Sequence, residues 1–438
     1  MKKIILNKIV FLLASFAAAV TFTSEASALP LFARQTGMEC AACHFQHFPM
    51  LTAFGRSFKN GAYSMVGAQE KVEGDNLSIP AVLNMAVLST AGYTKDNTAP
   101  TNPPAGVTSQ GSGDGVFYTP GNGGEFSLFI GGRTSDFSGA LAEVGLLNGG
   151  GGADGVTSAK IPMLWEVADG TRAGIVPFTT DGQGASYGFE TLNTGANAVH
   201  TMLFVGGDFT PNGTIGPALS AQQYIGTGAA ATGIAGVVNN ESYFINLTKF
   251  NQVAQDGGGA KLGSTYARGA YIFDLQGWDS AVGAQSWSGE SNDGSGSPDT
   301  ETKAWAIDGQ MQGMVGGMPV GFYAEYANAA APGAGGPDNA FNPGGADARS
   351  AFNISTEWGV IPEKATLALA IRRGKSGQAY NGSSNATDNS VLVSASYKLR
   401  QNMMLNLYYV SQSGDWWDQA NQDALGSKLT AINLATIF

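Results

Sequence analysis

The sequence predicts an all-β transmembrane β-barrel of about 16–18 antiparallel strands, preceded by a small N-terminal α-helical segment. Two observations predict this fold class. First, short stretches of alternating apolar and polar residues recur after Gly74, each close to the ~9–11 residues with which a tilted strand crosses a bilayer. Second, the connections between these stretches mostly alternate between short turns and long loops, as in outer-membrane barrels.

Residues 1–28 have the features of a secretory signal peptide. Three lysines lie among the first eight residues, Ile9–Val20 is an apolar core, and Ala26-Ser27-Ala28 is a cleavage site of the A-x-A type. We therefore expect an exported chain that begins at Leu29. An uncleaved helical anchor is the alternative, but the core is short for a membrane-spanning helix, and no later segment has ~18 apolar residues in succession.

Residues 29–74 carry the strongest chemical signal. The only two cysteines, Cys40 and Cys43, directly precede His44, which is one of only three histidines. C-x-x-C-H is the attachment motif of c-type haem, in which both thiols form thioethers with the haem and the histidine ligates the iron. A disulfide would be strained and has no thioredoxin-like surroundings, and a zinc site lacks a second pair of ligands. We therefore expect one covalent haem c.

The same segment predicts one helix that packs against the haem. Large apolar residues recur at helical spacing, namely Phe48, Leu51, Phe54 and Phe58. Pro49 would occupy the first turn, and Gly61 would end the helix. A plain surface helix is the alternative. A segment of this length cannot bury enough apolar surface alone, so we expect it to need the haem, the barrel or both, with the segment in the periplasm or in the barrel lumen.

The sixth ligand of the haem iron is open. Met65 is favoured because it follows the turn after the helix and could fold back over the ring. The alternatives are His47, Met50, Met85 and an open position. The first two lie so close in sequence to the proximal histidine that the opposite face of the haem is hard for them to reach. A methionine ligand would raise the haem potential, whereas ordinary packing is the other role open to Met65.

Residues 75–438 supply the expected barrel strands. In Val391–Lys398, valine, alanine and tyrosine side chains point one way, and serine and lysine side chains point the other. Similar stretches are Phe126–Gly132, Ala140–Leu146, Tyr271–Leu275, Ala304–Met311, Val320–Tyr326, Ser350–Trp358, Thr366–Ile371 and Met403–Tyr409. Aromatic residues concentrate near their ends, as interfacial girdles require.

The expected connections are of two kinds. Short turns are expected at residues 134–136, 168–170, 361–363 and 399–401. Long loops are expected near residues 94–124, 148–159, 250–262, 289–300, 329–347, 374–388 and 413–426. An even number of strands would place both ends of the barrel in the periplasm. The strand count is least secure over residues 208–240.

Composition excludes several classes of function. A net charge of −11 argues against a nucleic-acid partner. No acid–base pair, nucleophile triad or phosphate loop stands out, and the run Gly149–Gly152 follows no nucleotide-binding pattern. Acidic loop residues, among them Asp415, Asp418 and Asp423, could attract cations, although a solvated surface is the simpler interpretation.

A soluble β-sandwich or a solenoid is the alternative fold. No repeat of 20–50 residues of the solenoid kind is visible. The last predicted strand ends the chain at Phe438, which looks like the terminal signature of bacterial outer-membrane proteins. Both points favour the barrel.

Taken together, the chain resembles the outer-membrane cytochrome–porin fusion family, whose members include bacterial iron oxidases. The matching residues are Leu31-Phe32-Ala33-Arg34, Gly37-Met38, the C-x-x-C-H motif and Phe54–Tyr63. The resemblance is strongest over residues 29–93 and is architectural over the barrel. The chain departs from the family pattern by inserting Ala62 and by an additional His47.

The resemblance implies a function in electron transfer. It implies a haem c on Cys40, Cys43 and His44 in the outer membrane of a Gram-negative bacterium, with contact to its lipid. Electrons from extracellular Fe(II), or from another redox partner, would pass to a periplasmic c-type cytochrome or another electron carrier. The alternatives are a passive porin with a structural or sensory haem, and an exporter of electrons to an extracellular acceptor.

Overall fold

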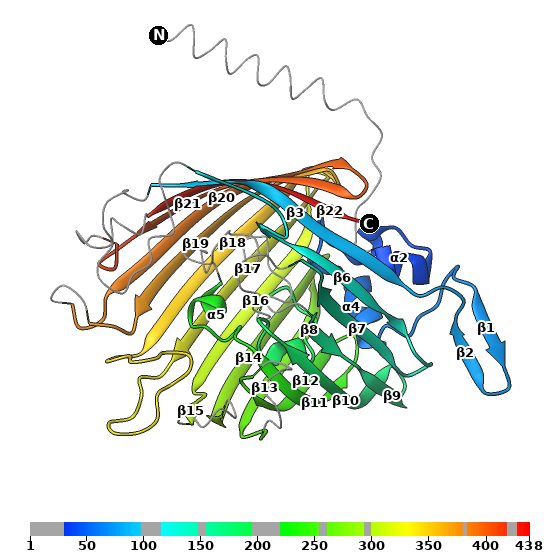
Figure 1. Cartoon of the computed structure of the whole chain (residues 1–438), viewed down its shortest axis with the longest axis horizontal. Helices are drawn as coiled ribbons and strands as arrows, with labels where there is room; N and C mark the ends of the chain where they lie inside the picture. The colour runs from blue at the N-terminus through cyan, green and yellow to red at the C-terminus, as the bar shows by residue number, and fades with distance from the viewer. Residues whose placement is uncertain are drawn as a thin grey trace, which may run out of the picture.

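The computed structural model describes residues 30–97, 115–147, 155–194, 220–253, 261–292, 299–379, 383–417 and 427–438. Within these residues the chain forms a closed β-barrel, with short helices in its mouth and lumen (Figure 1). The expected signal peptide and Leu29 lie outside the described residues. No helix among the described residues has both the length and the apolar character that a membrane crossing requires.

The helices are short. They are α2 (Pro30–Thr36), α3 (Cys40–Cys43), α4 (Ala53–Asn60), the 3₁₀ turn η1 (Ala185–Tyr187) and α5 (Ala221–Tyr224). The strands are β1 (Lys71–Gly74), β2 (Leu77–Pro80), β3 (Met85–Asp96), β4 (Val116–Pro120), β5 (Gly123–Gly124), β6 (Phe126–Arg133), β7 (Gly139–Gly145), β8 (Gly155–Lys160), β9 (Met163–Ala168), β10 (Thr171–Thr180), β11 (Ala231–Asn239), β12 (Tyr243–Asn251), β13 (Ser264–Leu275), β14 (Trp278–Ser291), β15 (Thr300–Glu301), β16 (Ala304–Val315), β17 (Met318–Ala329), β18 (Arg349–Ile361), β19 (Ala365–Ser376), β20 (Thr387–Arg400), β21 (Met403–Ser413) and β22 (Lys428–Ile437).

The described strands occupy sixteen positions around the wall, within the predicted range. Strands β4 and β6 pair with two different parts of β3 and share one position, as β8 and β9 do beside β10. Strands β5 and β15 are two-residue additions at the rim. Antiparallel pairing of β22 with β3 closes the wall, with Ile437 opposite Leu88. Because the number is even, the first strand begins and the last strand finishes at the same end of the barrel.

Side chains alternate between a polar interior and an apolar exterior. In β18, Phe352 and Ile354 are exposed while Asn353, Ser355 and Glu357 are buried inside the barrel. The predicted alternation in Val391–Lys398 is confirmed within β20. A closed wall with an apolar outer surface and a polar lumen satisfies every interior backbone group and presents apolar side chains to lipid. The chain is therefore an outer-membrane β-barrel.

The apolar exterior makes a prediction about stability. Ile354 lies at the middle of β18 and faces outward, so Ile354→Arg would place a charge in the hydrocarbon core. We expect this substitution to lower the free energy of unfolding by about 2–4 kcal/mol in lipid. The matched control, Val360→Arg, lies close to the turn at the end of the same strand and should cost about 0–1 kcal/mol. Urea titration of the protein in vesicles measures both, and equal costs would contradict the predicted depth of Ile354.

Short turns gather at one end of the barrel and long loops at the other (Figure 1). The four predicted turns are confirmed between β6 and β7, β9 and β10, β18 and β19, and β20 and β21. Further short turns follow β11, β13 and β16; the last contains Gly316 and Gly317, both with the positive φ that a tight hairpin of this kind needs. Both ends of the barrel lie at the short-turn end, which is the periplasmic end in such barrels.

One long connection folds back into the lumen. We call residues 181–230, between β10 and β11, the inner loop, of which 181–194 and 220–230 are described. Its helix α5 lies inside the barrel in Figure 1 and contacts β17, β18 and β19. Buried Arg268 of β13 binds Glu190 of the inner loop, at a distance of 3.0 Å, and Asp308 of β16. This three-residue network fixes the inner loop against the wall, and residues 220–230 of the loop fall within the stretch 208–240 where the predicted strand count was least secure.

Candidate functional site

The residues that precede the barrel lie in its mouth at the short-turn end. We call residues 30–67 the plug segment. Figure 1 shows α2 and α4 at the end of the barrel where the C-terminus lies. The segment contacts strands spaced around the barrel. Leu31 packs on Ala86 and Leu88 of β3, and Gln35 accepts from the Arg133 N–H of β6. Gln46 donates to the Pro319 carbonyl of β17, and Arg56 binds Asp279 of β14. The plug segment therefore spans the mouth rather than lying against one side of it.

The predicted helix is shorter than expected. Helix α4 begins at Ala53, because the Thr52 hydroxyl accepts the Gly55 N–H and caps the first turn. The prediction that Pro49 would occupy the first turn was wrong, whereas the end of the helix at Gly61 is confirmed. Of the two large apolar residues within α4, Phe54 is 37% exposed and Phe58 is buried.

Helix α4 packs directly on the short helix that carries the cysteines. A Cβ atom at Gly55 would lie 2.1 Å from the carbonyl oxygen of Cys43, so only glycine allows this approach. On the other side of the plug segment, the Phe58 ring contacts the rings of Phe32 and Tyr63. These contacts fix the position of the C-x-x-C-H motif within the plug segment.

The C-x-x-C-H motif forms one helical turn. Cys40 and Cys43, three residues apart, lie on the same face of α3, and both are free thiols. Burial raises the pKa of the Cys40 thiol to about 11 and also raises that of Cys43. The His44 N–H donates to the Cys40 carbonyl and ends the turn.

The His44 imidazole has the surroundings of a metal ligand. Its Nδ1 atom lies 3.1 Å from the Met50 carbonyl oxygen, which accepts a hydrogen bond from the neutral ring. This bond fixes the tautomer and places the lone pair on Nε2, the usual outer-shell arrangement of a metal-ligating histidine. Burial lowers the pKa of His44 to about 4, which keeps the ring neutral. Two thiols on one turn and an oriented, neutral imidazole fit a covalent haem.

The four candidates for the sixth ligand lie in different surroundings. Met50 is fully buried beside His44, while the Met65 carbonyl accepts from the Gln35 amide near β6. Met85 is 41% exposed and alternates with inward-facing Ala86, so its side chain points out of the lumen. The structure thus brings Met50 close to the C-x-x-C-H motif, whereas Met65 is bonded to Gln35 of α2 and Met85 lies in strand β3 of the wall.

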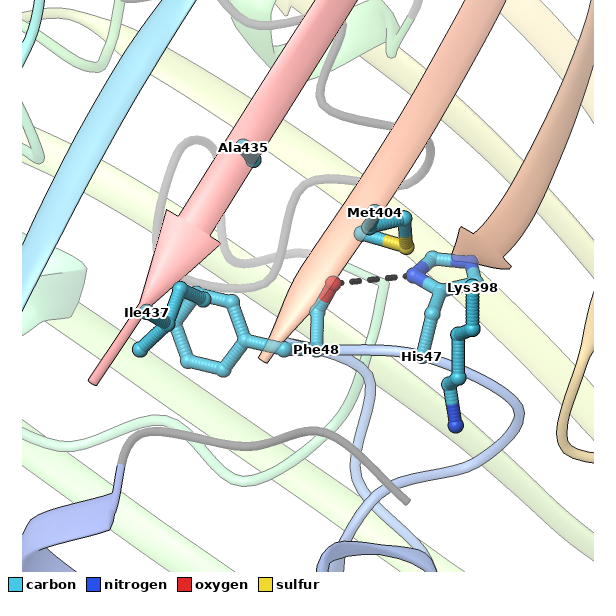
Figure 2. A pocket seen from close by; sticks show the side chains of 6 residues that line it. All are labelled: His47, Phe48, Lys398, Met404, Ala435 and Ile437. Carbon is cyan, nitrogen blue, oxygen red and sulfur yellow. Dashed lines mark hydrogen bonds between the residues drawn. The ribbon is translucent and has the colours of Figure 1, made fainter. Parts of the chain in front are cut away.

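His47 is an anchor of the plug segment. Its Nε2 atom lies 2.8 Å from Glu357 of β18, and its Nδ1 atom lies 2.9 Å from the Phe48 carbonyl oxygen. Figure 2 shows His47 and Phe48 at a small cavity with Met404 and Lys398 of the wall. Both ring nitrogens are therefore engaged. Burial is the largest single influence and lowers the pKa of His47, but the charge and hydrogen bond of Glu357, together with the hydrogen bond to the Phe48 carbonyl, outweigh it, so the pKa is raised.

The His47–Glu357 pair predicts a pH dependence. A histidine whose pKa is raised on folding stabilises the folded state fully below its unfolded pKa, and this contribution is lost as the pH rises through the folded pKa. Lys398 and His44 are the other titratable groups that act on His47. We expect amide exchange in residues 44–51, corrected for intrinsic rates, to be faster at about pH 8 than at about pH 6. His47→Gln should remove this difference, and an unchanged difference in that variant would contradict the assignment.

The comparisons with known proteins concern the barrel. No protein-family model matches the sequence, and no curated protein matches it. Among solved structures, OmpF of Salmonella typhi in complex with daunomycin is 12% identical, with 84% of this chain and 100% of that chain covered and a TM-score of 0.46. The channel DcaP of Acinetobacter baumannii is 11% identical over 81% of this chain and 97% of that chain, with a TM-score of 0.46. A porin refined at 1.8 Å resolution is 11% identical, with 82% of this chain and 100% of that chain covered and a TM-score of 0.47.

Sequence reasoning did not find the anchors of the plug segment. Glu357, Asp279 and Met404 lie hundreds of residues from the C-x-x-C-H motif, and each sits in a strand like any other inward-facing residue. Asp415, one of the loop carboxylates, follows β21 and accepts from the N–H of Thr387, the first residue of the neighbouring strand β20. Asp418 and Asp423 lie outside the described residues.

Proposed function

We propose that this chain is an outer-membrane monohaem cytochrome–porin that oxidises extracellular Fe(II) and passes the electrons to a periplasmic c-type cytochrome or another electron carrier. The observation that carries the proposal is the C-x-x-C-H motif in the mouth of a barrel that crosses the outer membrane. Cys40 and Cys43 share a helical face, and His44 is oriented by the Met50 carbonyl. These are the residues that would hold the haem, and a bound haem c supplies a one-electron redox centre.

The residues around the motif would keep the redox centre in place. Arg56 binds Asp279 of β14 at 2.7 Å, and His47 binds Glu357 of β18 at 2.8 Å. Two ion pairs to different strands oppose rotation of the plug segment within the mouth. A fixed position favours electron transfer, because the donor and acceptor need no rearrangement of the protein before each transfer.

Met65 is our proposed sixth ligand because it follows the turn after α4, whereas Met50 is so close in sequence to His44 that the opposite face of a haem is hard for it to reach. Both ring nitrogens of His47 are engaged, and Met85 faces out of the lumen. Met50 stays the alternative, since it is buried close to His44. Met65→Leu should abolish the near-infrared band of methionine-ligated ferric haem and lower the potential. An unchanged spectrum in that variant, together with loss of the band in Met50→Leu, would assign the position to Met50.

The contents of the lumen favour electron transfer over passive diffusion of solutes. The plug segment and the inner loop meet inside the barrel, where the Leu51 N–H donates to the Asn193 side chain at 2.7 Å and the Asn193 amide donates back to the Leu51 carbonyl at 2.9 Å. A porin with a structural haem would need an open path past both segments. The direction of electron flow depends on the haem potential and on the partners.

Reduction by Fe(II) tests the proposal. Full-length oxidised protein in detergent should show the alkaline haemochrome spectrum of one haem c and should be reduced by Fe(II) in stopped-flow mixing at neutral or mildly acidic pH. A protein with haem that Fe(II) does not reduce would overturn the iron-oxidase assignment. A low potential with rapid oxidation by Fe(III) would support electron export instead.

A further inference from the structure

A groove opens at the periplasmic rim on the side of α4 opposite the C-x-x-C-H motif. Its volume is about 560 Å³. One wall is the helix face formed by Ala53, Arg56, Ser57 and Asn60, which recur at helical spacing. The other wall comprises the turn after β11 and the ends of β13 and β14. The groove is therefore built jointly by the plug segment and the barrel.

Two buried polar atoms of this groove have no hydrogen-bond partner among the described residues. Arg56 is 4% exposed and Asn60 is 8% exposed. Arg56 binds Asp279 through Nη2, and its Nη1 atom is unpaired. Asn60 donates through Nδ2 to the Asn240 carbonyl, and its Oδ1 atom is unpaired. A buried donor or acceptor is costly to leave without a partner, so both atoms favour an occupant of the groove.

The unpaired atoms match a polypeptide backbone. One is a donor and the other an acceptor, and they lie four residues apart on one helix face. Each residue of an extended segment offers one carbonyl and one N–H, which are the complements of this pair. A free carboxylate or phosphate would satisfy Arg56 and leave the acceptor of Asn60 unpaired.

The remaining lining selects the side chains of the occupant. Glu241, Asp274 and Asp279 place three carboxylates around the groove against the single guanidinium of Arg56. This excess of negative charge attracts lysine or arginine and repels the headgroups of anionic lipids. Phe54 and Phe273 give the groove an apolar wall where an apolar side chain can pack.

We infer that this groove binds an extended segment of a basic periplasmic protein, with backbone bonds to Arg56 and Asn60 and lysine or arginine side chains facing the carboxylates. The inference rests on the proposed function only where it identifies the bound periplasmic partner as the electron carrier. Because Gly55 of α4 touches Cys43 and the next residue lines the groove, a partner held there would lie one helix away from the C-x-x-C-H motif.

Peptide binding to the full-length protein in nanodiscs tests the inference. The probe is a fluorescent pentapeptide that alternates lysine with phenylalanine, and the control peptide has glutamate in place of lysine. We expect saturable binding of the lysine peptide with a dissociation constant in the range of about 1–100 μM, and no binding of the glutamate peptide. Asn60→Leu keeps the Arg56–Asp279 pair and should weaken binding roughly tenfold.

Further variants separate the groove from other sources of binding. Asp274→Asn should weaken binding, whereas Asp169→Asn makes the same charge change in the turn after β9 and should leave it unchanged. Equal binding in wild type and Asn60→Leu, or equal binding in wild type and Asp274→Asn, would overturn the inference. Cys40→Ala/Cys43→Ala protein should bind the peptide as wild type does, so a failure of haem attachment and a failure of docking give different results.

Discussion

Replacing Cys40 and Cys43 together by alanine should yield a folded, colourless barrel without Fe(II)-dependent reduction. Both thiols lie in α3, outside the barrel wall, and no wall strand pairs with them. The wall is closed by the pairing of β22 with β3, which the substitutions do not touch. We therefore expect complete loss of the haem c spectrum, while the heat-modifiable shift of a folded barrel in gel electrophoresis is retained.

The control for this prediction is Cys43→Ala alone, which leaves one thiol for a single thioether and should give a lowered haem content with a shifted spectrum. His44→Ala removes the proximal imidazole and should change the spin state of the haem that is attached. A double cysteine variant that is still coloured after denaturation would contradict the assignment of covalent attachment. One that fails to fold would show that the two thiols, or the haem they hold, are needed for assembly of the barrel.

The wall could be predicted from the sequence because its signals are local. The two-residue period of β18 or β20 follows directly from which face meets lipid, and turns such as Gly316-Gly317 are specified by the residues within them. The inner loop has no such signal. Its burial depends on Arg268, which lies 78 residues from Glu190 and 40 residues from Asp308. An alternating pattern is also absent from a segment that is neither strand nor long helix.

The candidate site divides in the same way. Five consecutive residues carry the C-x-x-C-H motif, and its fold into one turn needs nothing distant. The anchors cannot be read locally, since Glu357 lies 310 residues from His47, and nothing in β18 marks it as the partner of a histidine. The extent of the helix was misjudged for a physical reason: Phe48 and Leu51 follow helical spacing, but Phe48 packs against Met404 of the wall and Leu51 binds Asn193 of the inner loop.

Deleting the plug segment should convert the barrel into a conducting channel. Residues 30–67 contact β3, β6, β14, β17 and β18, so the segment spans the mouth that ions would have to cross. The wall pairs with itself without them, and the polar side chains they cover, such as Asp279 and Glu357, tolerate water. We expect the single-channel conductance in planar bilayers to rise on the order of tenfold, as when a plug is removed from a water-filled barrel.

The matched control is deletion of the β1–β2 hairpin, which projects away from the mouth in Figure 1 and should leave the conductance unchanged. The inner loop stays in place in both deletion variants, held by Arg268, so it sets the conductance that remains after the plug segment is removed. Asn193→Ala removes two hydrogen bonds between the inner loop and the plug segment, leaves the packing of Ala62 with Phe189 and Leu192, and should give an intermediate value with frequent transitions. A full-length protein that already conducts as freely as the deletion variant would mean that the plug segment leaves an open path, and the passive porin would then explain the barrel better than electron transfer does.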